Sequence, residues 1–260
     1  MGISNTLGRS ALGLAAACLG GGAALADCTV QSGRERMLVI ELYTSEGCNS
    51  CPPADRWLSS LRPEAAAGRV LPLAFHVDYW DYLGWRDAYA QPQFSSRQRA
   101  AAARAGARTV YTPQVIADGR NFDRWRQPQA LQEALHRVEA RRAEADLQIG
   151  IRAATEGAEL DYRADVAGFS GNADLFLVRW ESGLSSRVTA GENRGEVLQQ
   201  DFVVRDWIGP LPAREGRRKL AGLPGAEEGW ALLAYARGSG ELLQAVNLPG
   251  VRCASRGSAR

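Results

Sequence analysis

The sequence predicts an α/β domain followed by a β-rich, sandwich-like domain. Strand and helix patterns alternate between residues 37 and 146, and the helix patterns there begin at prolines. The expected elements, in order, are Leu38–Thr44, Pro53–Leu61, Val70–Val77, Pro92–Ala105, Val115–Ala117 and Pro128–Ala145. Such alternation is typical of an α/β architecture with a small mixed sheet.

After residue 146 the pattern changes to short strands separated by turn residues. The expected strands are Leu147–Ala153, Glu159–Val166, Asp174–Trp180, Leu198–Asp206, Trp230–Arg237 and Glu241–Val246. About a hundred residues of this kind suffice for a β-sandwich. We therefore expect a signal peptide at 1–26, an α/β domain at 27–146, and a β-rich domain with a C-terminal tail at 147–260.

The first 26 residues have the pattern of a cleaved secretory signal. Their only charged side chain is Arg9, an apolar run covers 11–22, and small residues lead to Ala26. The run is shorter than the ~20 residues of a membrane span, and no later stretch is long enough. We expect cleavage after Ala26 and a periplasmic or secreted protein without a membrane span. The alternative is a lipoprotein carrying its lipid on Cys18, although Ala15 stands where a lipobox usually has leucine.

The charge balance gives no sign of a nucleic-acid partner. Without Arg9 the chain has 30 basic and 29 acidic residues. We expect Arg214, Arg217, Arg218 and Lys219 to form a solvated loop. A monomer is the default expectation.

Two cysteines separated by two residues, Cys48 and Cys51, lie between the first strand and the first helix. Amide groups at a helix N-terminus favour a thiolate, so we expect Cys48 to be the attacking thiolate and Cys51 the resolving thiol. Pro52 and Pro53 suit the first helical turn, and the helix dipole tolerates Asp55. The same spacing also occurs in half a zinc site and in a structural disulfide.

Two further cysteines, Cys28 and Cys253, lie near the ends of the mature chain. An even number of cysteines in an oxidising compartment indicates disulfides, and four cysteines permit three pairings. If Cys48 pairs with Cys51, then Cys28 and Cys253 are left to form a structural disulfide. The alternative is a pair of free thiols.

Three features are expected to converge on the dithiol. Thr112 and Pro113 precede an apolar strand, where a cis X-Pro bond can expose a backbone edge that docks a partner. Glu41, inside the first strand, is a candidate proton acceptor; the alternative is a glutamate that meets water or an arginine.

The third feature follows the second expected strand of the α/β part. His76 and Asp78 are two residues apart, so they can form a proton-transfer pair on one strand face. Alternatively, His76 joins Cys48 and Cys51 as a ligand of copper or zinc, or is a structural histidine. Tyr79 and Trp80 are expected to provide an aromatic floor for a substrate.

In the β-rich half of the chain, three polar residues have two possible roles. Glu192, Asn193 and Arg205 either line a groove between the domains or are turn and strand-end residues.

Several strings of this chain resemble the secreted thioredoxin-like family known as domain of unknown function 1223. They are Glu-Leu-Tyr-Thr-Ser-Glu-Gly-Cys-Asn-Ser-Cys-Pro-Pro-Ala-Asp at 41–55, His-Val-Asp-Tyr-Trp-Asp-Tyr-Leu-Gly-Trp at 76–85, Val-Tyr-Thr-Pro-Gln at 110–114, Val-Thr-Ala-Gly-Glu-Asn-Arg-Gly at 188–195 and Phe-Val-Val-Arg-Asp at 202–206. The resemblance implies a thioredoxin-like fold over 37–146 and export, and it brings no activity with it. Unlike thioredoxin, the chain has no tryptophan immediately before Cys48 and has Asn49 and Ser50 between its cysteines, so the reduction potential does not carry over.

The sequence as a whole favours an exported thiol–disulfide oxidoreductase that acts on the thiols or disulfides of other exported proteins. This chemistry requires no bound cofactor. Two alternatives remain: a copper- or zinc-binding module using Cys48, Cys51 and His76, and a non-catalytic binding protein whose Cys48–Cys51 bridge is structural.

Overall fold

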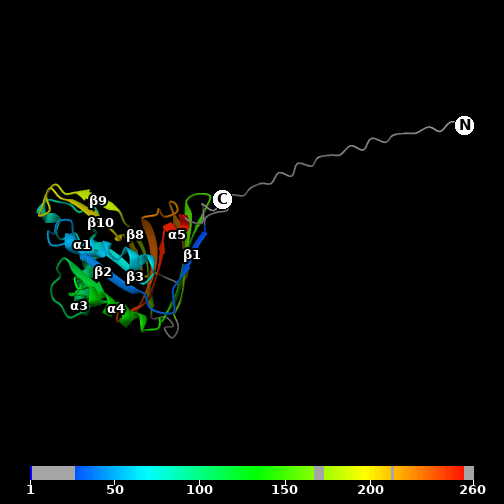
Figure 1. Cartoon of the computed structure of the whole chain (residues 1–260), viewed down its shortest axis with the longest axis horizontal. Coiled ribbons are helices and arrows are strands. Elements are labelled where there is room, and N and C mark those ends of the chain that lie inside the picture. Colours follow the sequence, from blue (N-terminus) through cyan, green and yellow to red (C-terminus); the bar gives the residue numbers. More distant parts are fainter. Residues whose placement is uncertain (2–26, 167–172, 212–213, 255–260) are drawn as a thin grey trace.

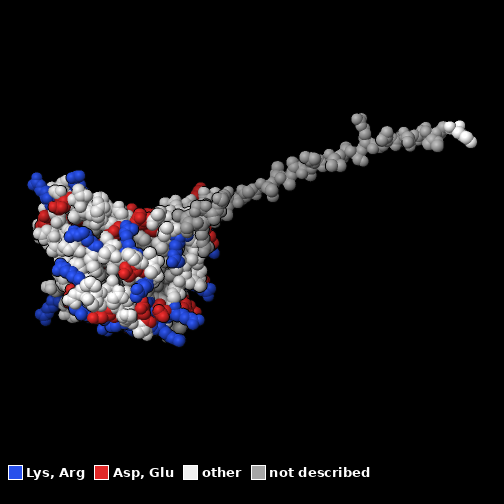
Figure 2. Space-filling view, viewed as in Figure 1, with Lys and Arg blue, Asp and Glu red and all other residues white. Residues whose placement is uncertain are grey.

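The fold is mostly β, with one large mixed sheet and few helices (Figure 1). The computed structural model describes Met1 and residues 27–166, 173–211 and 214–254. The expected signal peptide lies outside the described residues. On the face drawn in Figure 2, basic and acidic side chains are interspersed, in keeping with the balanced charge of the sequence.

An eight-stranded sheet forms the centre of the protein, in the order β14-β13-β8-β11-β3-β2-β4-β5. Its strands are β2 (Leu38–Thr44), β3 (Val70–His76), β4 (Gln114–Ala117), β5 (Arg120–Asn121), β8 (Ala173–Glu181), β11 (Val203–Ile208), β13 (Glu228–Ala236) and β14 (Leu242–Pro249). β3 lies parallel to both β2 and β11, and the other neighbours are antiparallel. Every residue of β2 and β3 is buried, as expected of central parallel strands covered on both faces.

A second, antiparallel sheet has the order β1-β6-β7-β12. It contains β1 (Asp27–Gln31), β6 (Asp146–Ala153), β7 (Ala158–Asp165) and β12 (Glu215–Leu220). Along β7 the side chains that alternate inward, such as Leu160 and Tyr162, share a hydrophobic core with Leu177 of β8 and Leu232 of β13. The smaller sheet therefore packs on the β8, β13 and β14 end of the larger one.

The division at residue 146 does not coincide with a break between sheets. β11, from the second half of the chain, pairs with β3 through Val203 and Ala74. β1, from the first half, pairs with β6 along its whole length. Alternation along a strand specifies which side chains are buried but not which strand lies alongside, so these pairings are not visible in the sequence.

Two details of the second half differ from expectation. The sequence predicts one strand over Leu198–Asp206, but this segment forms two strands, β10 (Val197–Gln200) and β11. The two strands are separated at Phe202, because its φ of 56° is incompatible with a continuous strand. Of the basic residues expected in a loop, Arg217, Arg218 and Lys219 lie in β12, paired with β7, and Arg214 directly precedes that strand. β12 is an edge strand, and charged side chains are well suited to such an edge.

Helices cover both faces of the β3-β2-β4 part of the sheet. They are α1 (Pro52–Ser59), α2 (Arg62–Ala66), the 3₁₀ turn η1 (Asp81–Leu83), α3 (Pro92–Arg104) and α4 (Pro128–Glu139), and a short α5 (Val251–Ala254) follows β14. Each of the helices α1 to α4 carries a proline in its first turn, where the missing N–H of proline costs little. Within the described residues, no helix is long and apolar enough to cross a membrane.

A small hairpin of β9 (Leu184–Arg187) and β10 stands beside α1, at the end of the molecule opposite the smaller sheet (Figure 1). Its connecting loop, residues 188–196, is called the hairpin loop below. At the other end, Cys28 of β1 and Cys253 of α5 form a buried disulfide, which confirms the predicted pairing.

Candidate functional site

The Cys48–Cys51 pair lies where β2 leads into α1. β2 ends at Thr44, a short turn carries Cys48, and Cys51 occupies the position just before the first helical residue. The two cysteines form a disulfide, as the adjacent pairing predicts. Both residues are 0% exposed, so the bridge is sealed from solvent.

The backbone amides at the start of α1 do not point at the sulfur atoms. Pro52 and Pro53 have no N–H group, while the N–H groups of Ala54 and Asp55 donate to the carbonyl oxygen of Cys51 at 2.8 and 3.1 Å. The N–H of Cys51 itself donates to the carbonyl oxygen of Cys48 at 3.2 Å. The predicted stabilisation of a Cys48 thiolate by these amides is therefore not present in this geometry.

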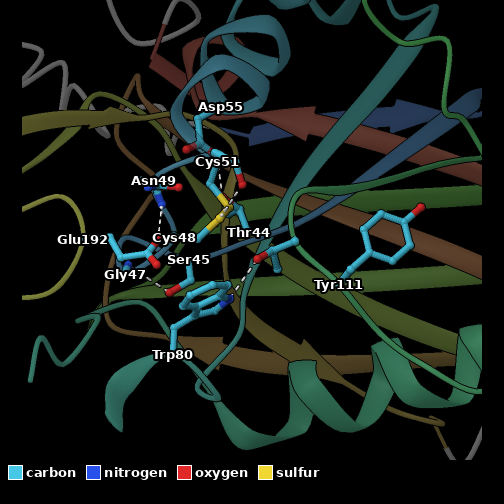
Figure 3. The surroundings of a disulfide bond; sticks show 12 residues. Thr44, Ser45, Gly47, Cys48, Asn49, Cys51, Asp55, Trp80, Tyr111 and Glu192 are labelled. Carbon is cyan, nitrogen blue, oxygen red and sulfur yellow. Dashed lines mark hydrogen bonds between the residues drawn. A yellow bond between two sulfur atoms is a disulfide. The ribbon is translucent and has the colours of Figure 1, made fainter. Parts of the chain in front are cut away.

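Asp55, in the first turn of α1, is a buried carboxylic acid next to Cys51 (Figure 3). The Thr44 hydroxyl donates to its Oδ1 at 2.8 Å. Burial raises the pKa of Asp55 to about 6, although the charge of His76 and the Thr44 hydrogen bond act in the opposite direction. The sequence suggested only a helix-dipole role for Asp55. Its spacing of four residues from Cys51, one helical turn, was the available signal.

His76, at the end of β3, pairs with Asp87 rather than with Asp78. Its Nδ1 lies 2.7 Å from Oδ2 of Asp87, and both side chains are fully buried. Burial alone would lower the pKa of His76, but the charge and hydrogen bond of Asp87 outweigh it and raise that pKa. Asp78 instead accepts a hydrogen bond from the Ser95 hydroxyl. The expected pair was wrong because β3 ends at His76, so strand alternation does not extend to Asp78.

Glu46 connects this pair to the turn that carries the dithiol. Its backbone N–H donates to Asp87 at 2.9 Å, and its own buried carboxylate accepts from the indole N–H of Trp85 at 2.9 Å. Burial raises the pKa of Glu46, and the charge of Asp87 adds to the effect. Three buried acids therefore surround the turn, with His76 among them.

Glu41 lies on the opposite face of β2 from Thr44. Odd and even residues of a strand face opposite sides, and Glu41 pairs with Arg97 of α3 at 2.5 Å, whereas Thr44 bonds to Asp55 of α1. The Tyr43 hydroxyl also donates to Glu41 at 2.9 Å. The structure does not bring Glu41 to the dithiol; it matches the alternative of a glutamate that meets an arginine.

The expected docking edge reaches the same end of the sheet as the dithiol. β4 begins at Gln114, which pairs with Tyr43 of β2, so the two preceding residues lie near the end of β2. The Thr112–Pro113 peptide bond is cis, as expected. The indole N–H of Trp80 donates to the Thr112 hydroxyl at 2.8 Å.

Trp80 also lies against the turn before Cys48 (Figure 3). A Cβ added to Gly47 would lie 3.0 Å from the Cβ of Trp80, so only glycine fits there without displacement. The Tyr79 hydroxyl donates to buried Gln98 of α3 at 3.0 Å. Of the two aromatic residues expected at the site, Trp80 alone lies between the cis peptide and the dithiol turn.

The hairpin loop closes the site from the second half of the chain. The Asn193 side-chain amide donates to the carbonyl oxygens of Glu46 and Cys48 at 2.8 and 3.0 Å, and Asn193 is buried. The backbone N–H of Asn49 donates to the Glu192 carboxylate at 3.0 Å (Figure 3). Glu192 and Asn193 are turn residues, the second of the two sequence alternatives, and from this turn they contact the first half of the chain.

The described residues contain no group of three or more His, Cys, Asp and Glu side chains arranged to hold a metal ion. Cys48 and Cys51 are joined to each other, and His76 uses Nδ1 for Asp87. The Nε2 atom of His76 is buried without a hydrogen-bond partner.

These observations define a mostly β protein with a sealed disulfide at a strand-to-helix turn. Residues 39–229 match the family described as a protein of unknown function (DUF1223). The match covers most of the chain, so the protein belongs to this family.

Two solved structures resemble this fold. Protein AGR_C_4864 from Agrobacterium tumefaciens, solved by X-ray crystallography, is 28% identical with a TM-score of 0.60, and the alignment covers 84% of this chain and 96% of that one. HBP35 of Porphyromonas gingivalis is 12% identical with a TM-score of 0.59 over 84% of this chain and 76% of that one, which is a likeness of fold alone. No curated protein matches the sequence.

Proposed function

We propose that this protein is an exported thiol–disulfide oxidoreductase built on a thioredoxin-like core. One arrangement carries the proposal: the Cys48–Cys51 disulfide between β2 and α1, linked through Trp80 to the cis Thr112–Pro113 edge. A dithiol can exchange electrons with a partner, and an exposed backbone edge can align that partner.

The thioredoxin-like assignment for residues 37–146 is supported by strand order and helix placement. In the segment β3-β2-β4-β5, β3 and β2 are parallel while β4 and β5 are antiparallel to their neighbours. α1 and α3 contact side chains on opposite faces of β2. Thioredoxin-like folds combine such a sheet with a dithiol at the start of the first helix after the central strand.

In the proposed reaction, the Cys48 thiolate attacks one sulfur of a partner disulfide, and the first partner thiol leaves. The Cys51 thiol then loses its proton and attacks the Cys48 sulfur, which releases the second partner thiol and closes the Cys48–Cys51 bridge. Asp55 is the proton acceptor in this step, because it lies beside Cys51 and its pKa of about 6 is close to neutral pH. This assignment replaces Glu41, which faces the other side of β2.

Export is proposed on the basis of the signal-like first 26 residues and the two disulfides. The disulfide between Cys28 and Cys253 is buried and resembles those of proteins that fold in oxidising compartments. Exported proteins that carry thiols or disulfides are the proposed partners.

The reduction potential of the Cys48–Cys51 pair tests the proposal. It is measured against a glutathione series, with thiol state followed by alkylation and mass. We expect a value of roughly −120 to −270 mV, the range of known exchange proteins. Cys51→Ser should trap partners as mixed disulfides, and Cys48→Ser, the matched control, should not. A potential below about −300 mV with no trapped partner would falsify the proposal.

A second candidate is a binding protein in which this bridge is structural. The observation that favours it is burial, since both cysteines are 0% exposed and the hairpin loop bonds over them. This candidate predicts that mild reductants leave the Cys48–Cys51 bridge intact in the folded protein.

A further inference from the structure

The groups around the Cys48–Cys51 pair all favour its disulfide form over its thiolate form. We propose that this dithiol works in the reducing direction: its reduced form transfers electrons to the disulfides of exported proteins, and an external dithiol donor regenerates it. The inference rests on the proposed function and adds the direction of electron flow and the residue that sets it, Glu192.

The start of α1 does little to stabilise a thiolate at Cys48. A strongly oxidising dithiol depends on a well-stabilised thiolate at the first cysteine, commonly through helix N-terminal amides. Here Pro52 and Pro53 supply no N–H, and those of Ala54 and Asp55 are used by the carbonyl oxygen of Cys51. The Cys48 sulfur has the Ser50 hydroxyl at 3.3 Å, a neutral and weak partner.

Acidic side chains lie on both sides of the Cys48–Cys51 bridge. The Glu192 carboxylate accepts the N–H of Asn49, the residue directly after Cys48, at 3.0 Å. On the other side of the bridge, Asp55 lies beside Cys51 (Figure 3). A negative group close to a thiol disfavours the thiolate, because the two charges repel. The positive charge that His76 could contribute is paired with Asp87 at 2.7 Å.

Burial of the pair also favours its disulfide form. A thiolate loses its hydration when it is buried, whereas a disulfide is neutral and loses little. Both cysteines are 0% exposed, and Asn193 fastens the hairpin loop to the carbonyl oxygen of Cys48 at 3.0 Å. Closing the loop over the oxidised pair therefore stabilises the product of the reducing reaction.

Each cycle oxidises one Cys48–Cys51 dithiol to the disulfide and reduces one partner disulfide to two thiols, with two electrons and two protons transferred. The donor dithiol then reduces the Cys48–Cys51 bridge by the same exchange and is itself oxidised to a disulfide.

Direction is tested with two substrates and the full mature chain. We expect the reduced protein to reduce the disulfides of insulin, and the oxidised protein to leave an unfolded dithiol peptide reduced. Rapid oxidation of the peptide would overturn the reducing direction while the proposed function stands. Inactivity with both substrates, together with no partner trapped by Cys51→Ser, would overturn the proposed function as well.

The role of Glu192 is tested with Glu192→Gln, which removes the charge and keeps an oxygen that can accept the Asn49 N–H. We expect alkylation of Cys48 in the reduced protein to become about threefold faster at pH 7, and the midpoint of its pH profile to shift to lower pH. This magnitude corresponds to the loss of one solvent-exposed charge–charge interaction. The equilibrium with glutathione at pH 8.5 should shift toward the dithiol by a similar factor.

Glu196→Gln is the matched control, because Glu196 is an exposed glutamate in the same hairpin loop. It should leave both measurements unchanged, and circular dichroism should confirm that both variants fold. An unchanged pH profile in Glu192→Gln, or an equal shift in Glu196→Gln, would remove Glu192 from the proposal.

Discussion

Asn193 donates a hydrogen bond of 3.0 Å to the backbone carbonyl oxygen of Cys48, although the two residues lie 145 positions apart in the sequence. The same side chain holds the carbonyl oxygen of Glu46 at 2.8 Å. One amide group from the second half of the chain thus fixes the turn that carries the dithiol. Because both cysteines are 0% exposed, a partner can reach the sulfur atoms only after a neighbouring segment moves, and we expect the hairpin loop to be that segment.

Removal of the Asn193 side chain should therefore expose the disulfide. We expect Asn193→Ala to remove the side-chain donor of the Glu46 carbonyl oxygen, to leave the Cys48 carbonyl oxygen with the Cys51 N–H alone, and to lower the free energy of unfolding by about 1–3 kcal/mol. Reduction of the Cys48–Cys51 bridge by dithiothreitol should become faster, as followed by alkylation and mass. Arg194→Ala, an exposed neighbour in the same loop, is the control, and equal rates in the two variants would contradict the gating role of Asn193.

The choice between Asp55 and Glu41 as proton acceptor can be made kinetically. The mixed disulfide with glutathione on Cys48 is prepared, and its resolution by Cys51 is followed at pH 7. Asp55→Asn should slow this step about tenfold or more, because the Cys51 proton loses its acceptor. Glu41→Gln should slow it much less, since Glu41 contacts Arg97 on the other face of β2. The opposite order would restore Glu41 to the site.

Asp55 should also make stability depend on pH. Its pKa rises from 3.8 to about 6 on folding. Well below pH 3.8 both states are protonated, so the group contributes nothing there. As pH rises through the window from 4 to 6, the unfolded state ionises first and the folded state loses stability, by up to ~3 kcal/mol for two pKa units.

Asp55→Asn should accordingly be more stable than the wild type at pH 7 and about equal at pH 4. Urea unfolding at several pH values measures the difference. The comparison with the variant isolates Asp55 from the other acids, whose contributions are common to both proteins. A stability difference that does not change between pH 4 and pH 7 would contradict the buried acid.

The Cys28–Cys253 disulfide should contribute strongly to stability. It joins residues separated by 225 positions, and the chain-entropy model gives its largest effects for such long loops. Replacing both cysteines by serine should lower the free energy of unfolding by about 2–5 kcal/mol in urea titrations. Cys48→Ser/Cys51→Ser is the comparison, and its loss should be smaller because that pair closes a short loop.

Much of the first half could be predicted from the sequence. Apolar runs with β-branched residues located β2 and β3, and prolines marked the starts of α1, α3 and α4. The two disulfides match the one of three possible pairings in which the neighbouring Cys48 and Cys51 bond to each other, and the Thr112–Pro113 position suggested the cis peptide. These signals are local, because each depends on the spacing of a few neighbouring residues.

Long-range contacts could not be predicted in the same way. The pairing of β11 with β3, the His76–Asp87 pair and the contact of Asn193 with Cys48 each join segments whose proximity depends on the whole fold. The error at Glu41 had a different, local origin. Its distance along the strand was compatible with a role at the dithiol, but an odd rather than an even position placed it on the opposite face.

The bridge between β1 and α5 has a further consequence for the fate of the protein. With Cys28 and Cys253 joined, nearly all of the described chain is one covalent ring. A protease that cuts a surface loop inside the ring opens it without releasing a fragment. An unfoldase that pulls on either terminus meets a closed loop. It has to draw two chain segments through its central pore at once, or the bridge has to be reduced first.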